Sequence, residues 1–332
     1  MESVAYYLKT FLAPLSGLLD QADVTDIYVN RPGEVWAERA GGTIDCIKHA
    51  ELSTAMLEQL ARQIAAMSHQ GISREHPLLS ASLPHGERVQ IIAPPATRRN
   101  YAIAIRKQVT ANFGLAELGR AGVFDRQPLR EKQERTDTAL GKLLRAGQWE
   151  ELLRLAVHSR KTILVSGGTA TGKTTLLNAL IQEIPTKERL IYIEDTPELD
   201  LVHSNAIGLI AARSALGEAT VSAESLVAAS MRMRPDRVIV GEVRGSEAFS
   251  FLRAINSGHP GSMTSIHADS PEGAIDQLAL LLLQSGTQLR RDDIHHYVAR
   301  TIDVYVQLSR LSGKRFVSDI ALRSPAGTLV RV

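Results

Sequence analysis

Cysteine is almost absent from this sequence: Cys46 is the single one among 332 residues. One thiol can form neither an internal disulfide nor a four-cysteine zinc module, so we expect a reducing compartment, the cytoplasm. Long apolar runs are absent too, because no stretch approaches the roughly 18 residues that a membrane-spanning helix needs. We therefore expect at most peripheral association with a membrane.

Aromatic residues and excess charge are also scarce. The 38 Lys and Arg residues nearly balance the 36 Asp and Glu residues, which leaves a net charge of +2, and aromatic residues make up 5% of the chain. A nucleic-acid-binding surface usually combines a basic patch with aromatic side chains. The composition therefore predicts no direct nucleic-acid binding and is typical of a globular protein with about two domains.

The most specific motif lies within residues 161–181, KTILVSGGTATGKTTLLNALI. A short apolar run predicts a strand, a glycine-rich G-x-x-x-x-G-K-T loop follows, and leucines at helical spacing predict a helix. In such a loop, backbone N–H groups and the helix N-terminus bind phosphate oxygens. We expect Lys173 to reach the β- and γ-phosphates as a catalytic residue, and the Thr174 hydroxyl to bind Mg²⁺. The predicted nucleotide-binding residues are Gly167, Gly168, Thr169, Ala170, Thr171, Gly172, Lys173, Thr174 and Thr175.

Carboxylates follow two further predicted strands. Glu194 and Asp195 end an apolar run after the P-loop helix, and Glu242 follows the strand at 237–240. A strand followed by a carboxylate is the Walker B pattern, but Gly241 stands where an Mg²⁺-associated aspartate is common. We therefore assign the metal to Glu194 and Asp195 and expect Glu242 to orient or deprotonate the attacking water. An acidic surface turn is the alternative for the first pair.

Three more residues are candidates by position. His267 ends a predicted strand at 263–266, from where it could reach the γ-phosphate, although a lone histidine is more often structural. Arg88 follows a turn, and Arg106 closes an apolar strand. A solvated strand-end arginine is the ordinary interpretation of both, and a contact with phosphate is the alternative.

The chain divides into three parts. Residues 1–107 combine alternating apolar runs with an amphipathic helix, which predicts a small, mostly antiparallel α+β domain. We expect the apolar stripe in the first 19 residues to pack on that domain, and binding to a membrane surface is the alternative. Residues 108–147 are a predicted linker, because the stretch 125–138 has eight charged residues and one large apolar residue. A linker of this length could place one domain over a neighbouring subunit. Residues 148–332 alternate strands and helices, which predicts an α/β domain.

Several blocks of this sequence resemble the hexameric secretion ATPases, and the traffic ATPases of bacterial type IV secretion and conjugation systems most closely. In that family IEDTPEL is similar to the Asp box, RVIVGEVRG to the Walker B block and GHPGSMTSIHA to the His box, which is the most specific of them. The similarity extends over nearly the whole chain. The blocks are residues 86–88, 167–174, 194–198, 231–236 with 241–242, and 258–267.

This resemblance implies a RecA-like P-loop ATPase domain of the α/β class, preceded by a smaller α+β N-terminal domain that covers the nucleotide, in a homo-hexamer. It implies ATP and Mg²⁺, and it implies that Arg88 and Arg106 reach the phosphates, either within a chain or across an interface. Arg232 and Arg234 are the next candidates. Relatives share the glycine at Gly241.

The function implied is an ATP-hydrolysing motor that powers the assembly of a type IV secretion channel or the transfer of substrates through it. Its partners would be other cytoplasmic and inner-membrane components of the channel, at the cytoplasmic face of the inner membrane. A type IV pilus or type II secretion motor is the first alternative. A RecA-like nucleic-acid translocase is the second, which strand displacement coupled to turnover would support. A nucleotide-dependent scaffold without hydrolysis is the third.

Overall fold

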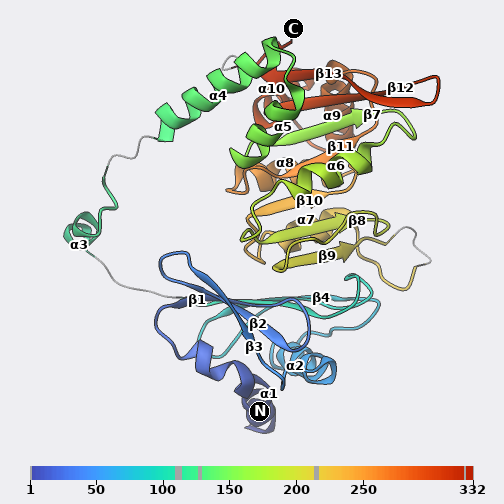
Figure 1. The fold of residues 1–332 in the computed structure, drawn as a ribbon. Helices are drawn as coiled ribbons and strands as arrows, with labels where there is room; N and C mark the ends of the chain where they lie inside the picture. Colours follow the sequence, from blue (N-terminus) through green and yellow to red (C-terminus); the bar gives the residue numbers. More distant parts are fainter. Residues whose placement is uncertain (1, 109–113, 126–128, 213–216, 325–326, 332) are drawn as a thin grey trace.

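The computed structural model describes residues 2–108, 114–125, 129–212, 217–324 and 327–331. The chain forms two β-sheets, each packed against helices, and the smaller sheet is built from the N-terminal third of the sequence (Figure 1). The larger sheet begins at Ile163. The predicted order, a smaller α+β domain followed by an α/β domain, is confirmed.

The N-terminal sheet is antiparallel and has the strand order β3-β2-β1-β6-β5-β4. Helices α1 and α2 contact each other and bury Leu15, Leu60 and Ile64 in the core of this domain. The apolar stripe of α1 therefore packs on its own domain, as predicted. No helix among the described residues has the length and apolar character needed to cross a bilayer. The elements are α1 (Glu2–Leu19), β1 (Val24–Val29), β2 (Glu34–Arg39), β3 (Ile44–Lys48), α2 (Thr54–Met67), β4 (Leu78–Ser82), β5 (Arg88–Ile92) and β6 (Ala102–Arg106).

The larger sheet has the order β14-β13-β12-β7-β11-β10-β8-β9, with its six strands from β12 to β9 parallel to one another. Side chains of α4 (Leu129–Arg145), α5 and α6 bury one face, and those of α7, α8, α9 and α10 bury the other. Since both faces are covered, the strands are nearly continuous apolar runs. The elements are α5 (Trp149–His158), β7 (Ile163–Gly167), α6 (Lys173–Gln182), β8 (Leu190–Glu194), β9 (Ala206–Ile210), α7 (Ala223–Ser230), β10 (Arg237–Val240), α8 (Glu247–Asn256), β11 (Met263–Ile266), α9 (Pro271–Gln284), α10 (Arg291–Thr301), β12 (Val304–Leu311), β13 (Lys314–Arg323) and β14 (Leu329–Val330).

The predicted linker, 108–147, contains two helices, α3 (Leu115–Arg120) and α4 (Leu129–Arg145). Helix α3 and the start of α4 stand apart from both domains (Figure 1). At the other end of α4, Leu140 and Leu144 are buried against the domain of the larger sheet. The last turns of the linker are thus part of that domain's core, while 109–113 and 126–128 lie outside the described residues.

The N-terminal domain covers the β9 edge of the larger sheet. Ile210 N–H donates to the Ala96 carbonyl (2.9 Å), and Arg98 N–H donates to the Gly208 carbonyl (3.0 Å), so this short segment continues the sheet in antiparallel fashion. The side chain of Arg98 lies over Gly208, where an added Cβ would come within 2.6 Å of it. These two backbone hydrogen bonds give the β9 edge a hydrogen-bonded neighbour, and they join the N-terminal domain to the larger sheet.

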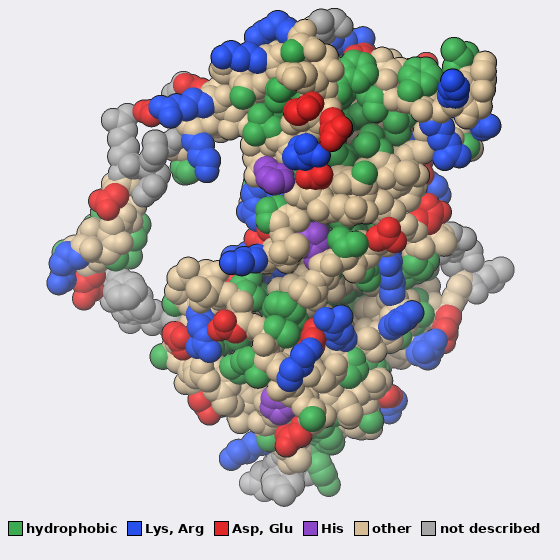
Figure 2. Space-filling view, in the orientation of Figure 1, with side chains coloured by type: hydrophobic (Ala, Val, Ile, Leu, Met, Phe, Trp, Pro, Cys, Tyr) green, Lys and Arg blue, Asp and Glu red, His purple; other side chains and the backbone are tan. Residues whose placement is uncertain are grey.

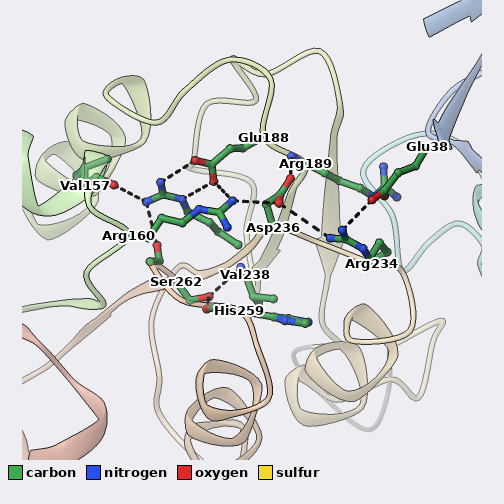
Figure 3. Close-up of polar contacts among 12 residues, drawn as sticks. Glu38, Val157, Arg160, Glu188, Arg189, Arg234, Asp236, Val238, His259 and Ser262 are labelled. Atoms are coloured by element: carbon green, nitrogen blue, oxygen red, sulfur yellow. Dashed lines mark hydrogen bonds and ion pairs between the residues drawn. The ribbon is translucent and has the colours of Figure 1, made fainter. Parts of the chain in front are cut away.

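Polar side chains extend this boundary at the amino ends of the parallel strands (Figure 3). Arg189 is buried, stacks on the Tyr28 ring at 4.0 Å, and donates to the side chains of Asn30 (2.8 Å) and Asn205 (2.5 Å). Burial lowers the pKa of Arg189 to about 10. Because Tyr28 and Asn30 belong to the N-terminal domain, Arg189 joins the two domains through cation–π and hydrogen-bonding contacts.

A second buried arginine, Arg237, makes two hydrogen bonds with Glu188, at 2.7 and 2.9 Å. Arg160 donates to the same carboxylate at 2.9 Å (Figure 3). Burial by itself would raise the pKa of Glu188, but the hydrogen bonds from Arg237 and Arg160 outweigh it and hold that pKa below its ordinary value. Glu188 is therefore the carboxylate that neutralises a fully buried guanidinium.

We expect Glu188→Gln to lower the free energy of unfolding by about 3 kcal/mol, because it leaves the buried Arg237 charge without its counter-ion. Glu183→Gln is the control, since Glu183 pairs with Arg154 near the surface, where such pairs contribute less than about 1 kcal/mol. The stabilisation by Glu188 is complete above the ordinary glutamate pKa of about 4.3 and is lost as the pH falls through its lower folded pKa. Denaturant unfolding at pH 7 and at pH 3 measures both effects, and equal losses in the two variants would contradict this role.

Candidate nucleotide-binding site

The glycine-rich loop connects β7 to α6, as predicted. Gly172 precedes α6 with a φ of +97°, a left-handed conformation that favours glycine. An added Cβ at Gly167 would lie 2.9 Å from the Leu308 carbonyl oxygen of the adjacent strand. The Thr171 hydroxyl donates to the Gly168 carbonyl (2.9 Å) and closes the loop. The predicted nucleotide-binding residues, 167–175, therefore run from the end of β7 through the loop into the first turn of α6.

Lys173 is buried and folds back over this loop. Its ammonium group donates to the carbonyls of Gly167 (3.0 Å) and Gly168 (3.3 Å), and lies 3.3 Å from His267 Nδ1. Burial lowers the pKa of Lys173, because it penalises the charged form. A bound phosphate group would add negative charge beside this buried cation and offset the penalty of burial.

His267 lies between Lys173 and Glu242. Its Nε2 is 2.7 Å from a Glu242 carboxylate oxygen, while its Nδ1 faces Lys173. The other oxygen of Glu242 accepts a hydrogen bond from Arg244 (2.8 Å), whose guanidinium is also 3.4 Å from Asp195. Three predicted site residues from three strands and loops are thus in direct contact, since β7, β11 and β10 are neighbours whose carboxyl ends meet at one edge.

Glu194 is held differently from the other predicted metal ligands. It is buried, and one oxygen accepts hydrogen bonds from the backbone N–H groups of Glu198 and Leu199, both at 2.8 Å. The second oxygen is paired with Arg98 of the segment that covers β9. Most of its acceptor capacity is already used within the protein. An added Cβ at Gly241 would lie 3.3 Å from Glu194 Cγ, so a larger residue there would press on this side chain.

Oxygen ligands for a divalent cation surround a pocket of about 80 Å³ next to the loop. The Thr174 hydroxyl is 3.2 Å from a Glu198 carboxylate oxygen, so Glu198 lies closest to the predicted metal-binding hydroxyl. A hydroxyl and carboxylates are the ligands that Mg²⁺ prefers, usually one or two of them together with phosphate oxygens. The hydroxyl and carboxylates here fit an Mg²⁺ ion that is bound together with phosphate. In the described ranges, no cluster of three or more His, Cys, Asp or Glu side chains could hold a metal ion by itself. The residues around the pocket are Thr174, Glu194, Asp195, Thr196, Glu198, Leu199, Gly241, Glu242 and Arg244.

Arg88 and Arg106 lie elsewhere within the chain. They are opposite each other on β5 and β6 and contribute to a separate pocket of about 600 Å³, whose described lining includes Arg232 but no residue of the glycine-rich loop. Arg234 is paired with Glu38 at 2.8 Å across the domain boundary (Figure 3). Among the residues that the structure describes, no hydrogen bond or ion pair joins these arginines to the glycine-rich loop, and their predicted contact with phosphate stays a prediction.

Two residues of the site, Arg98 and Arg244, were not predicted to act there, and a third, Glu198, follows the strand that ends at Glu194 but was given no role of its own. Arg98 has no local signal, since it stands in a proline-containing loop far from the motif in sequence. Arg244 and Glu198 lie inside blocks that the resemblance had marked, RVIVGEVRG and IEDTPEL, but their contacts depend on how strands β8 and β10 end.

A scan against protein families matches residues 9–311 to the family described as "Type II/IV secretion system protein". The type IV secretion system protein VirB11 of Bartonella quintana is 39% identical over 334 aligned positions, covering 96% of this chain and 93% of that protein. The type IV secretion system protein PtlH of Bordetella pertussis is 39% identical and covers 97% and 95%. Among solved structures, the VirB11 ATPase from the Brucella suis type IV secretion system, in complex with sulphate, superposes with a TM-score of 0.88 at 36% identity, covering 96% and 95%.

Proposed function

Because this chain belongs to the Type II/IV secretion system protein family, we propose that it hydrolyses ATP to ADP and phosphate, with Mg²⁺, as the motor of a type IV secretion system. Its resemblance to the type IV secretion ATPases is confirmed by relatives about 39% identical over nearly the whole chain. The observation that carries the proposed reaction is the contact of His267 with both Lys173 and Glu242 at the P-loop. Lys173, His267 and Glu242 meet there at the carboxyl edge of the parallel strands.

The proposed roles follow from these contacts. Lys173 leaves the loop carbonyls to bind the β- and γ-phosphates and offsets the charge that develops on them. Glu242 accepts a hydrogen bond from the attacking water and takes its proton. His267 keeps Glu242 and Lys173 in register, and Arg244 fixes the second oxygen of Glu242.

Thr174, with Asp195, Glu194 and Glu198 around it, would hold Mg²⁺. When bound, Mg²⁺ supplies positive charge to the phosphate oxygens. Glu194 is the least available of these ligands, because backbone N–H groups and Arg98 already occupy its oxygens. We therefore propose two roles for Glu194: it holds the loop at 194–199 through hydrogen bonds, and it contributes to the proposed Mg²⁺ site.

We further propose that Arg88 and Arg106 complete the site of a neighbouring subunit. The pocket that they line has no residue of the glycine-rich loop among the described residues, although phosphoryl transfer usually needs additional cations around the γ-phosphate. A contact between unlike surfaces, repeated by rotation, closes into a ring, and the family resemblance implies six subunits. The ring would act at the cytoplasmic face of the inner membrane, with other channel components as partners and without direct nucleic-acid contact.

Mixed assemblies test this shared site. A Lys173→Ala subunit keeps its arginines, and an Arg88→Ala/Arg106→Ala subunit keeps its P-loop; each alone should be inactive. Mixing them should restore ATP turnover at interfaces that join an intact loop to intact arginines, and turnover of the natural chain should rise with protein concentration. Differently tagged subunits, purified through both tags, show that mixing occurred. Co-purified assemblies without activity would place the arginines within one chain.

A further inference from the structure

The β12–β13 hairpin overhangs the phosphate-binding loop. Strand β12 runs parallel to β7, with Leu308 opposite Gly167 at the end of β7. The chain then continues past that edge to Leu311, turns, and returns as β13, so that Arg310 is paired with Arg315 near the tip. The hairpin is therefore the wall of the site on the side away from β11.

Strand alternation decides which hairpin side chains face the loop. Leu308 is buried in the cluster that includes Leu177 and Leu180 of the P-loop helix. Arg310 lies two residues further along β12 and projects from the same face, as does its cross-strand partner Arg315. Lys314, one residue earlier on β13, projects from the opposite face.

Arg315 reaches the loop itself. Its Cδ atom lies 3.4 Å from the position that a Cβ on Gly172 would occupy, so the Arg315 side chain passes beside the residue that precedes Lys173. The side chain is exposed, and within the described part of the chain no Asp or Glu oxygen lies within ion-pairing distance of Arg310, Lys314 or Arg315. Figure 2 shows Lys and Arg side chains gathered over this hairpin.

We propose that Arg315 contacts the phosphate chain of the nucleotide bound to the P-loop of its own chain, an inference that rests on the proposed function. An arginine without a carboxylate partner, beside a loop built to bind phosphate, presents a planar group of N–H donors that matches two phosphate oxygens. Unlike Arg88 and Arg106, it is already adjacent to the loop within one chain. Arg315 adds a cation where the β12–β13 hairpin borders the loop, whereas the carboxylates proposed to bind Mg²⁺ lie at the carboxyl end of β8.

Binding measurements test this contact without requiring turnover. The probes are ADP, a non-hydrolysable ATP analogue and inorganic tripolyphosphate, each titrated with Mg²⁺ by calorimetry. We expect Arg315→Ala to raise the Kd of all three about tenfold, equivalent to ~1.4 kcal/mol. Lys314→Ala removes the same charge from the same hairpin but from its other face, and should change each Kd less than about twofold. Arg315→Lys, which keeps the charge but not the two-pronged donor, should fall between them.

Three results would overturn the assignment: unchanged Kd values in Arg315→Ala, equal losses in Arg315→Ala and Lys314→Ala, or a loss for the nucleotides but not for tripolyphosphate. The last would mean a contact with the base or ribose instead of phosphate. Circular dichroism melting curves verify that each variant is folded. If the natural chain binds these probes but does not hydrolyse ATP, the proposed function fails while the Arg315 contact is still measured.

Discussion

Replacing Lys173 with alanine is expected to abolish ATP hydrolysis, with a loss in kcat of about a hundredfold or more. The reason is local: Lys173 is the buried cation of the loop, and its ammonium group lies within 3.3 Å of His267, at the centre of the proposed reaction. Its lowered pKa shows that burial penalises this charge, which a bound phosphate would offset. Steady-state phosphate release measures the effect.

The matched control is Lys187→Ala, which removes an exposed lysine shortly after the P-loop helix. Turnover by that variant should stay near the natural rate, because an exposed charge outside the site contributes little to the transition state. A folded Lys173→Ala protein with near-normal turnover would mean that this loop binds something other than the hydrolysed nucleotide.

Changing Glu242 to glutamine is expected to separate binding from chemistry. The amide keeps the size of the side chain and can still bond to Arg244, but it cannot take a proton from water, so ATP should bind with near-natural affinity while kcat falls about 10²- to 10⁴-fold. Binding of labelled ATP and single-turnover hydrolysis on the same preparation measure the two quantities independently.

Glu194→Gln is the comparison, because Glu194 is the other carboxylate at this edge of the sheet. Its oxygens accept from two backbone N–H groups and from Arg98. Glutamine has one acceptor oxygen in place of two, so Glu194→Gln would lose some of these bonds beside the proposed Mg²⁺ site. We expect it to raise the Mg²⁺ concentration needed for half-maximal turnover, whereas Glu242→Gln should not be rescued by Mg²⁺ at any concentration. Normal hydrolysis in Glu242→Gln together with its loss in Glu194→Gln would invert the two roles.

The central part of the site could be predicted because it depends on local order in the chain. The spacing of Gly167, Gly172, Lys173 and Thr174 places them on one strand-loop-helix unit, whatever the rest of the fold does. The ends of buried apolar strands could be located in the same way, and parallel strands have their carboxyl ends on one edge. The contact of His267 with Glu242 and Lys173 was therefore within reach of sequence reasoning, although its distances were not.

The partners of the arginines could not be predicted from the sequence, because the charge of an arginine and its position along a strand do not specify which carboxylate it pairs with. Arg234 lies within one of the blocks that the resemblance marked, yet it pairs with Glu38 of the other domain. Arg98 carried no signal, yet it pairs with Glu194, because residues 96–98 extend the sheet beyond β9. A guanidinium at the end of a flexible side chain finds its carboxylate only once distant segments have docked.

By itself, then, the sequence determined the phosphate-binding loop, the carboxylates and histidine at the strand ends, the order of the two domains and the family. All of these except the family rest on periodicity and short-range spacing, which survive any arrangement of the remaining chain. The family was identified from the resemblance of whole sequence blocks. Only the tertiary structure decided that Glu194 is paired with Arg98, that Arg88 and Arg106 lie away from the loop of their own chain, and that Arg315 lies beside Gly172. Each of these depends on contacts between residues tens to more than a hundred positions apart, whose energies act only after the sheets have formed and packed.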